Sequence, residues 1–423
     1  MERTKKIMKR ENIDWLIATT PENVFYSIGF RSLGQWLMRS SKIEVLVLIP
    51  AQDPTRSVLI SPAQELDVAA AIPPRVSKVC PVGHITIEPG DRSLWEEPDH
   101  RLAQWTLDTP SYTSVYHAVE TLNLIQPNQR VALDDNLTYE GLREVLSPQT
   151  ELFIAPEVIQ DIRVIKTEEE LELMRKGVQI AEEGLRQSMA ALCTGISELE
   201  LGHIYNTSVV KAGAVPYMTL VGIGSNGASP NHPSTNRQLR PNELIRWDVG
   251  CEVDGYRVDL GFIAFYGEPS PKVVKYADAI ARAQTACFNA MQAGNKLSEV
   301  YQIGFDMMKA VIPAYKRKHL GHGVGVELRE PPIIAPKEAQ NERGVTFDRS
   351  KQATADLLEL GMVIALEVLY YELGLGGFQI EDTIIVTEQG PVRLNKLPYE
   401  LTVVPVKDKD HNKQEVINEA LTK

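Results

Sequence analysis

Short apolar runs alternate with helix-like stretches through the first 162 residues of the chain. The runs are DWLIATT, IEVLVLIP, RSVLISP, RVALDD and TELFIAP. Runs of this kind are typical of buried strands, and strands that alternate with helices predict an α/β domain. The segment from about residue 80 to 116 breaks this rhythm, and we interpret it as a surface excursion that could reach a partner subunit.

A different pattern begins near residue 164. Thr167 and Glu170 form a capping-box pair, and apolar residues then recur at helical spacing as far as Ala191. Starts of further helices are indicated at Ser197, Ser270 and Ser298. Between them lie the strand-like runs LVGIGS, ELIRWDVGCEV, YRVDLGFIAFYG, GMVIALEVLYYE and GFQIEDTIIVTEQG. Helices in groups, combined with antiparallel hairpins, predict an α+β domain.

The patterns divide the chain into three expected parts. They are an α/β domain over 1–163, an α+β domain over 164–406 and a charged tail over 407–423. Within the second domain, the polar stretch 336–356 is an apparent insertion. It is either a solvated loop or a lid that narrows a pocket.

Composition narrows the classes of function. The 423 residues include 44 basic and 56 acidic side chains, which gives a net charge of −12. A broad basic surface for nucleic acid is therefore not expected. The apolar run near the N-terminus is too short for a secretory signal, and far short of the roughly 20 residues of a membrane span. We expect a cytoplasmic protein with no nucleic-acid or membrane partner.

The hairpin RWDVGCEVDGYRVDLGFIAF brings two acids together. Asp254-Gly255 is a favoured two-residue turn, and pairing outwards from it places Gly250 opposite Asp259. Asp248 lies two residues before Gly250, so it projects from the same face as Asp259, about 7–8 Å away diagonally. Two carboxylates side by side in a sheet repel each other and need a cation between them. That cation is either a metal ion or the guanidinium groups of two nearby arginines, Arg246 and Arg257.

Further ligand-type residues follow downstream. Glu367 lies inside one apolar run and Glu381 at the start of another, where unpaired carboxylates are rare. His322 lies in a glycine-rich bend that leaves its ring accessible. Four carboxylates and a neutral imidazole are suitable ligands for two divalent first-row ions about 3.5–4 Å apart.

With these residues in place, the chain resembles a known family, the creatinase, aminopeptidase P, prolidase and methionine aminopeptidase group with the pita-bread fold. The matching segments are VIKTEEELELMRKGVQIAEEGL, IGSNGASPNHPSTNR, WDVGCEVDGYRVDL, GHGVGVELREPP, ALEVLYY and QIEDTIIVTEQG. They resemble, in order, the family's entry helix, its substrate-histidine loop, its aspartate hairpin, its G-H-G segment and its two glutamate strands.

The resemblance implies a pita-bread catalytic domain preceded by a creatinase-type N-terminal domain, often in a homodimer. The metal ligands it implies are Asp248, Asp259, His322, Glu367 and Glu381. They would bind two divalent metal ions, and Mn, Co, Zn and Fe are all compatible with oxygen and nitrogen ligands.

Residues expected around the substrate depart from the family pattern. Asn231 stands where the peptidases have a histidine, and His232 follows one place later. Arg329 replaces a second family histidine, and Gln379 replaces an arginine. We expect Asn231, His232 and Arg329 to contact the substrate. The planar guanidinium of Arg329 suits a substrate carboxylate.

The leading hypothesis is a metallopeptidase-like hydrolase that cuts an amide-like C–N bond, with an Xaa-Pro dipeptidase or aminopeptidase first. Its substrate is a short peptide or another small molecule. Two bound ions would activate a water for attack on the carbonyl. Glu367 would carry the proton to the leaving nitrogen, and His232 would bind the developing oxyanion.

Two alternatives remain at this level. One is a non-peptidase member of the fold, namely an amidinohydrolase, ring-opening hydrolase or lyase acting on a small carboxylate-bearing substrate. The other is an inactive module that uses the pocket for recognition. Close to two metal equivalents in the purified protein favours the hydrolase, and no metal favours the alternatives.

Overall fold

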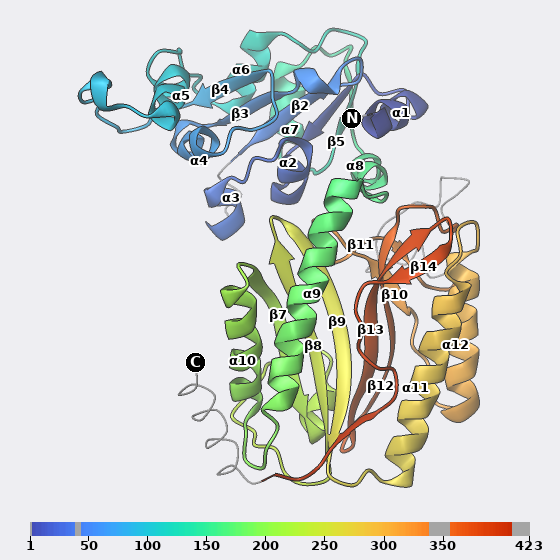
Figure 1. Ribbon diagram of the computed structural model, residues 1–423. Helices are drawn as coiled ribbons and strands as arrows, with labels where there is room; N and C mark the ends of the chain where they lie inside the picture. Colours follow the sequence, from blue (N-terminus) through green and yellow to red (C-terminus); the bar gives the residue numbers. More distant parts are fainter. Residues whose placement is uncertain (1, 39–43, 338–355, 408–423) are drawn as a thin grey trace. The chain divides into compact units, whose positions relative to one another are not determined.

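The computed structural model describes residues 2–38, 44–337 and 356–407 of the chain (Figure 1). These residues form two compact units, Met1–Arg163 and Val164–Lys423. The charged tail after Lys407 and the greater part of the 336–356 insertion lie outside the described residues. The two expectations for these segments therefore stay predictions.

A six-stranded mixed sheet forms the centre of the first unit, in the order β4-β3-β2-β1-β5-β6. The strands are β1 (Trp15–Ala18), β2 (Leu46–Pro50), β3 (Val58–Pro62), β4 (Lys78–Val82), β5 (Arg130–Leu133) and β6 (Glu151–Ile154). The helices are α1 (Glu2–Arg10), α2 (Pro21–Ile28), α3 (Leu33–Met38), α4 (Leu66–Ala71), α5 (Glu97–Thr106), α6 (Val115–Leu122), α7 (Tyr139–Val145) and α8 (Pro156–Arg163). The α/β prediction is confirmed, and each predicted run is a strand.

The segment near residues 80–116 is more regular than its sequence indicates. Strand β4 overlaps its start, and α5 lies in its middle. Strand β4 contains Pro81 and is an edge strand, where a residue without an N–H is tolerated. Helix α5 buries only Ala103, so it lacks the apolar stripe by which a helix is recognised.

The second unit is built on a nine-stranded sheet. Its main path runs β11-β10-β12-β13-β9-β8-β7, with β14 on β13 and β15 on β9. The strands are β7 (Val215–Ile223), β8 (Glu243–Val253), β9 (Tyr256–Tyr266), β10 (Gly321–Gly323), β11 (Glu330–Ile333), β12 (Val363–Glu372), β13 (Gly376–Thr387), β14 (Gly390–Arg393) and β15 (Thr402–Val404). The predicted α+β architecture is confirmed.

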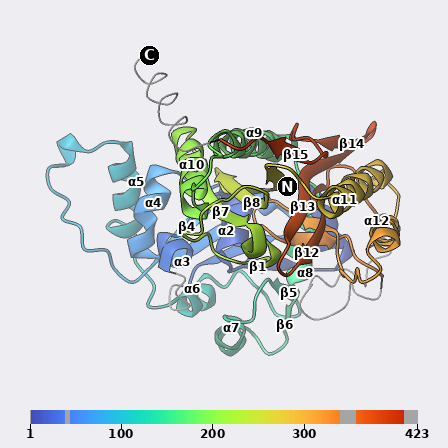
Figure 2. The ribbon, with the colours of Figure 1, turned by 90° about the horizontal axis from the view of Figure 1, so that it is seen from below.

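Four helices cover one face of this sheet: α9 (Glu168–Ala190), α10 (Glu198–Lys211), α11 (Pro271–Ala290) and α12 (Leu297–Val311) (Figures 1 and 2). The predicted capping boxes at Thr167 and Ser197 are both formed. Apolar side chains of α11 and α12 share a buried core with β12 and β13. The helices thereby leave the opposite face of the central strands for polar side chains.

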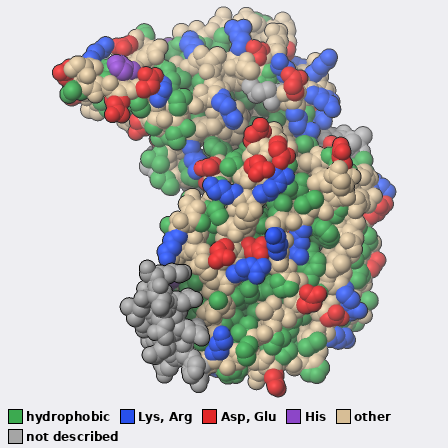
Figure 3. Space-filling view, in the orientation of Figure 1, with side chains coloured by type: hydrophobic (Ala, Val, Ile, Leu, Met, Phe, Trp, Pro, Cys, Tyr) green, Lys and Arg blue, Asp and Glu red, His purple; other side chains and the backbone are tan. Residues whose placement is uncertain are grey.

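Two observations concern partners. In the part of the chain that the structure describes, no helix is long and apolar enough to cross a membrane. Acidic and basic side chains are interspersed over the face shown in Figure 3. That mixture accords with the acidic composition and not with a continuous basic patch.

Candidate metal centre

Five neighbouring strands each carry one of the predicted ligands. In their order across the sheet, these are His322 on β10, Glu367 on β12, Glu381 on β13, Asp259 on β9 and Asp248 on β8. Residues that are far apart in the sequence therefore reach one region of the sheet.

The β8–β9 hairpin has the predicted register. Asp254 and Gly255 both have positive φ angles, +46° and +89°, as a two-residue type I′ turn requires. Gly250 pairs with Asp259, and Asp248 pairs with Gly261. The hairpin prediction is confirmed, and both carboxylates project from one face of the sheet.

The other pairings extend the same face. Glu367 on β12 pairs directly with Glu381 on β13, and Glu381 pairs with Gly261 on β9. Directly opposed residues in an antiparallel sheet project to the same side. Gly261 therefore lies between Asp248 and Glu381 in one row and carries no side chain between the two carboxylates.

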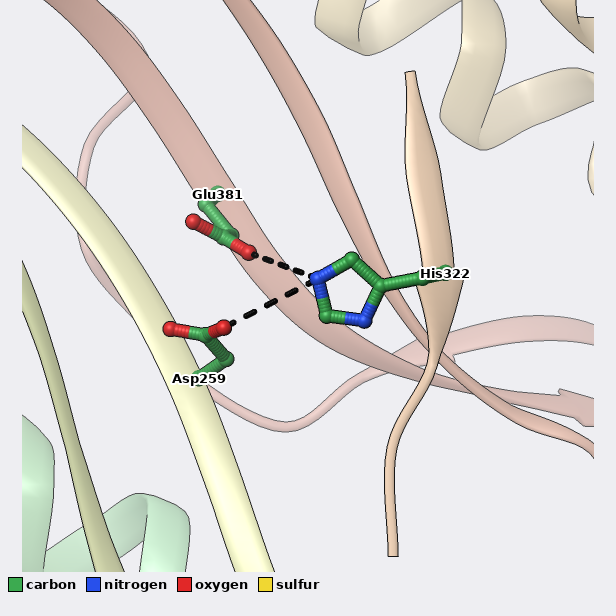
Figure 4. A group of neighbouring side chains, drawn as sticks. All are labelled: Asp259, His322 and Glu381. Carbon is green, nitrogen blue, oxygen red and sulfur yellow. Dashed lines mark ion pairs between the residues drawn. The ribbon is translucent and has the colours of Figure 1, made fainter. Parts of the chain in front are cut away.

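Asp259, His322 and Glu381 make a tight buried cluster (Figure 4). The Nε2 atom of His322 lies 3.8 Å from Oδ2 of Asp259 and 3.9 Å from Oε1 of Glu381. One ligand atom from each residue lies within 4.8 Å of the other two. The three side chains are at most 4% exposed, so water does not screen their charges.

Electrostatics in this cluster are unfavourable without an added cation. Burial raises the pKa of Asp259 well above its usual value, and the charges of Asp248 and Glu367 raise it further. Burial and the charge of Asp259 likewise raise the pKa of Glu381. Among the described residues, Oδ1 of Asp259 and Oε1 of Glu381 have no hydrogen-bond partner. Such buried acceptors are suited to an ion.

His322 is also prepared as a ligand. Burial lowers the pKa of its ring to about 4, which keeps the imidazole neutral. Its Nδ1 lies 3.0 Å from the carbonyl of Gly323 and must donate to that acceptor. The lone pair of Nε2 therefore faces the two carboxylates, as in metal-binding histidines. The donor set fits a divalent first-row ion.

Glu367 lies among two arginines and a histidine. Its carboxylate lies 3.1 Å from Arg317, 3.3 Å from His319 and 3.4 Å from Arg329. Burial alone would raise the pKa of Glu367, but the charge of Arg317 and the hydrogen bond from His319 hold it below its usual value. Glu367 is therefore ionised, and its contacts with these three side chains orient its carboxylate.

The two hairpin arginines form ion pairs with different acids. Arg246 donates to Oδ2 of Asp248 at 3.2 Å, whereas Arg257 pairs with Glu252 at 3.3 Å. The ion-pair interpretation therefore holds in part for Asp248. It does not hold for Asp259, which lies with His322 and Glu381.

The predicted substrate residues lie outside the tight cluster. Asn231 is exposed, and Nδ1 of His232 lies 2.7 Å from the carbonyl of Pro233. Within the described residues, no hydrogen bond or ion pair joins His232 to a candidate ligand. Arg329 has a side chain that is 56% exposed and contacts Glu367.

Sequence reasoning missed Arg317 and His319. They precede His322 in the basic run KRKH, which was not singled out. The run itself was the available signal, because a basic cluster directly before a ligand-bearing strand is placed near acids. Another unpredicted contact is the buried pair of Lys166 with Glu330, at 2.5 Å, which holds the residue next to Arg329.

Two family models match the chain. Metallopeptidase family M24 matches residues 172–388, and the Creatinase/Prolidase N-terminal domain matches residues 1–165. The first match covers every candidate ligand as well as Asn231, His232 and Arg329.

Curated relatives and solved structures agree with the family models. The Xaa-Pro dipeptidase of Pyrococcus furiosus is 27% identical over 288 residues, which are 67% of this chain and 78% of the relative. A probable dipeptidase PepE of Mycobacterium bovis is 30% identical over 256 residues, 60% of this chain and 64% of the relative. In structure, dipeptidase PepE of Mycobacterium ulcerans is similar with a TM-score of 0.74, 23% identity and 96% coverage of both chains. Prolidase of Pyrococcus furiosus is similar with a TM-score of 0.70 and 23% identity, covering 93% of this chain and 99% of the prolidase.

Proposed function

The chain belongs to metallopeptidase family M24, and from that premise we propose that it hydrolyses short peptides, with Xaa-Pro dipeptides as its substrate class. The observation that carries the proposal is the buried cluster of Asp259, His322 and Glu381, in which two carboxylate oxygens have no hydrogen-bond partner within the described part of the chain. The relatives described above carry the names of peptidases. They favour a peptidase over the amidinohydrolase, ring-opening and lyase alternatives.

We propose two divalent metal ions as the cofactor, with Mn²⁺ first among Mn, Co, Zn and Fe. The residues that would hold them are Asp248, Asp259, His322, Glu367 and Glu381. Bound ions of this kind supply a polarised carbonyl and a water that ionises near neutral pH. The neutral ring of His322 and the pairing of Glu367 with Glu381 support this assignment.

Proton transfer is assigned to Glu367. Arg317 donates to Oε2 of Glu367, and this charge helps to keep the carboxylate ionised, so it can accept a proton and pass it to the leaving nitrogen. His232 is proposed to bind the developing oxyanion, because its Nε2 is not used by the contact that Nδ1 makes. Asn231 is proposed to line the same part of the site.

Recognition of the substrate is assigned to Arg329. A half-exposed guanidinium beside a candidate ligand is accessible to an incoming carboxylate and can bind it through two parallel hydrogen bonds. A free carboxylate close to the scissile bond is a property of dipeptides. Arg329 therefore favours a dipeptidase over an aminopeptidase that acts on longer chains.

The setting completes the proposal. We propose a cytoplasmic homodimer that binds neither nucleic acid nor membranes, in line with its net charge of −12 and the match of residues 1–165 to the Creatinase/Prolidase N-terminal domain. Light scattering coupled to size exclusion would measure its oligomeric state. A monomer at micromolar concentration would contradict this part of the proposal.

The decisive test is a hydrolysis screen. The enzyme is purified without chelator, its metal content is measured, and it is assayed on Xaa-Pro dipeptides, Xaa-Pro tripeptides, cyclic amides and guanidino compounds. We expect close to two metal equivalents and preferential cleavage of dipeptides, with both lost in Asp248→Ala. The metal assignment is wrong if Asp248→Ala keeps wild-type metal content and activity. The substrate assignment is wrong if no dipeptide is cleaved by the metal-loaded wild type.

A further inference from the structure

Two buried charged side chains hold the loop that carries Asn231 and His232. The loop, defined here as residues 224–237, begins with the short 3₁₀ helix η4 (Gly224–Ala228) directly after β7. Glu198 contacts both of its ends, and Arg246 contacts its middle. Arg246 also contacts the candidate metal ligand Asp248.

Glu198 anchors the ends of the loop to the first turn of α10. Its fully buried carboxylate accepts hydrogen bonds from the amide N–H of Ile223 at 2.8 Å and from the side chain of Asn226 at 3.0 Å. It also accepts from the N–H and hydroxyl of Thr235, at 2.9 and 2.6 Å. These donors are neutral and belong to the loop or to the end of β7. Glu198 therefore fixes where the loop begins and ends.

Arg246 contacts the middle of the loop through backbone atoms. Its Nη2 donates to the carbonyl oxygens of Pro230 at 2.8 Å and Ser229 at 3.3 Å. These carbonyls directly precede Asn231 and His232. The side chain is 1% exposed, so water does not compete for the hydrogen bonds.

The other nitrogen of the same guanidinium faces the candidate metal centre. Nη1 of Arg246 donates to Oδ2 of Asp248 at 3.2 Å and to Oε1 of Gln379 at 2.8 Å. Gln379 in turn donates through Nε2 to Oε2 of Glu381 at 2.7 Å. One guanidinium is thus linked directly to Asp248 and through one amide to Glu381.

The geometry of these contacts requires an arginine. Nη1 and Nη2 are held in one plane and point to different sets of acceptors. The ring of Tyr371 lies 5.3 Å from the guanidinium carbon, and its hydroxyl contacts Nη1 at 3.3 Å. A lysine ammonium is a single point, so it cannot reach the loop carbonyls and Asp248 with the same geometry.

From these contacts we propose that Arg246 is a positioning residue that couples metal binding at Asp248 to the conformation of the loop carrying Asn231 and His232. A metal ion would fix the position of the Asp248 carboxylate. That carboxylate would then hold the guanidinium of Arg246, and the guanidinium would hold the carbonyls of residues 229 and 230. The inference rests on the proposed function only in taking Asp248 as a metal ligand. The role proposed for Arg246 is indirect, acting through Asp248 and the loop carbonyls.

The test compares Arg246→Lys with Arg257→Lys. Arg257 is a matched control, because it lies on the same hairpin, is 6% exposed and pairs with a buried glutamate, Glu252. Mn²⁺ is titrated into the metal-free full-length protein by calorimetry. Hydrogen exchange of the peptides that cover residues 224–237 is followed by mass spectrometry with and without Mn²⁺.

In the wild type and in Arg257→Lys, Mn²⁺ should slow exchange in the loop by roughly tenfold. In Arg246→Lys, Mn²⁺ affinity should fall by about 10- to 100-fold, as for other partners of metal ligands. At saturating Mn²⁺, the loop of this variant should still exchange at its metal-free rate. This loss of linkage is what a purely structural role of Arg246 would not produce.

Two results would overturn the coupling. One is a wild-type loop whose hydrogen exchange does not change when Mn²⁺ binds. This result does not depend on whether a variant folds. The other is an Arg246→Lys loop that Mn²⁺ protects as well as in Arg257→Lys. Neither readout uses a substrate, so an error in the assigned peptide substrate would leave this test intact. Absence of Mn²⁺ binding to the wild type would instead contradict both proposals.

Discussion

Asp259 shows most directly what a single residue contributes to the centre. It is a buried acid that faces other acids, with one oxygen unpartnered among the described residues. Groups of this kind destabilise a metal-free protein and stabilise the metal-bound one, because only the ion balances their charge. Removing the charge should therefore have opposite effects on the two forms.

Asp259→Asn tests this inversion. The metal-free variant should melt at a higher temperature than the metal-free wild type at neutral pH, because it no longer buries an acid whose pKa is raised by burial and by neighbouring acids. The wild type should gain about 2.7 kcal/mol at an Mn²⁺ concentration 100 times its Kd, and the variant should gain nothing. Thermal unfolding with and without Mn²⁺ measures both effects. Asp254→Asn, at the exposed turn of the same hairpin, is the control and should behave as wild type.

Arg329 is the second residue whose replacement is informative. If its planar guanidinium binds a substrate carboxylate, Arg329→Lys should lower kcat/KM almost as much as Arg329→Ala. The expected fall is roughly 30-fold, which corresponds to a loss of about 2 kcal/mol of transition-state stabilisation. Arg282, an exposed arginine paired with Asp278, is the matched control, and its replacement by lysine or alanine should be neutral. Steady-state kinetics on the best dipeptide, with metal content checked, give the answer. Equal rates on the amidated dipeptide would argue against the carboxylate contact.

At the scale of elements, the position of the loop of residues 224–237 depends on a glycine that allows close backbone approach, as well as on Arg246. A Cβ added to Gly377 on β13 would lie 2.0 Å from the carbonyl oxygen of Gly227 and 2.9 Å from Cδ of Arg246. The first neighbour is backbone and cannot rotate away. The close approach of η4 to β13 therefore depends on glycine at position 377.

Gly377→Ala should displace η4 and the loop from β13. We expect a loss of stability of about 1–3 kcal/mol, as for other overpacked sites, together with a raised KM. Gly202→Ala in α10 is the control, because its added Cβ meets nothing closer than 3.4 Å and alanine favours a helix. Chemical denaturation and kinetics of both variants make the comparison. Unchanged stability and KM in Gly377→Ala would show that η4 can move without consequence.

Elements with local signals could be predicted from the sequence. The capping boxes at Thr167 and Ser197 and the turn at Asp254-Gly255 depend on neighbouring residues, so the pattern contains the information. The turn also set the hairpin register, and with it the shared face of the two aspartates. Strand β4 and helix α5 were not predicted, since an edge strand with a proline and a helix that buries a single residue have weak periodicity.

Contacts that depend on the sheet as a whole could not be predicted from spacing. Arg317 and His319 reach Glu367 only because β10 pairs with β12, which no local pattern encodes. The same reason applies to Arg246, whose link to Gln379 crosses from β8 to β13. The sequence pattern singled out the five candidate ligands and the resemblance assigned them to one centre, whereas the side chains around them had to come from the structure.

At the scale of the whole molecule, the two compact units have separate sources of stability. The candidate metal centre belongs to the unit Val164–Lys423, whereas the unit Met1–Arg163 has its own apolar core. Within that first unit, the buried carboxylate of Asp134 accepts hydrogen bonds from Thr19 and from Asn23.

Calorimetry should resolve these two sources. Removing metal with a chelator should lower the melting temperature of one transition, that of the unit containing the centre. Asp134→Asn should destabilise the first unit by about 1–3 kcal/mol and so lower the melting temperature of the other transition. The cause is that the NH₂ group of asparagine would face Thr19 and Asn23, which themselves donate hydrogen bonds at this site. A single unfolding transition, whose melting temperature falls in both experiments, would contradict independent units.

The placement of the ligands on five different strands also determines when the centre can exist during folding. His322, Glu381 and Asp259 meet only after β10, β12, β13 and β9 have paired, and these pairings join distant parts of the chain. Such contacts of high sequence separation form slowly. If they are not yet made at the rate-limiting barrier, Mn²⁺ should leave the refolding rate unchanged and slow unfolding instead. Metal would then extend the lifetime of the folded enzyme without helping the nascent chain to reach it.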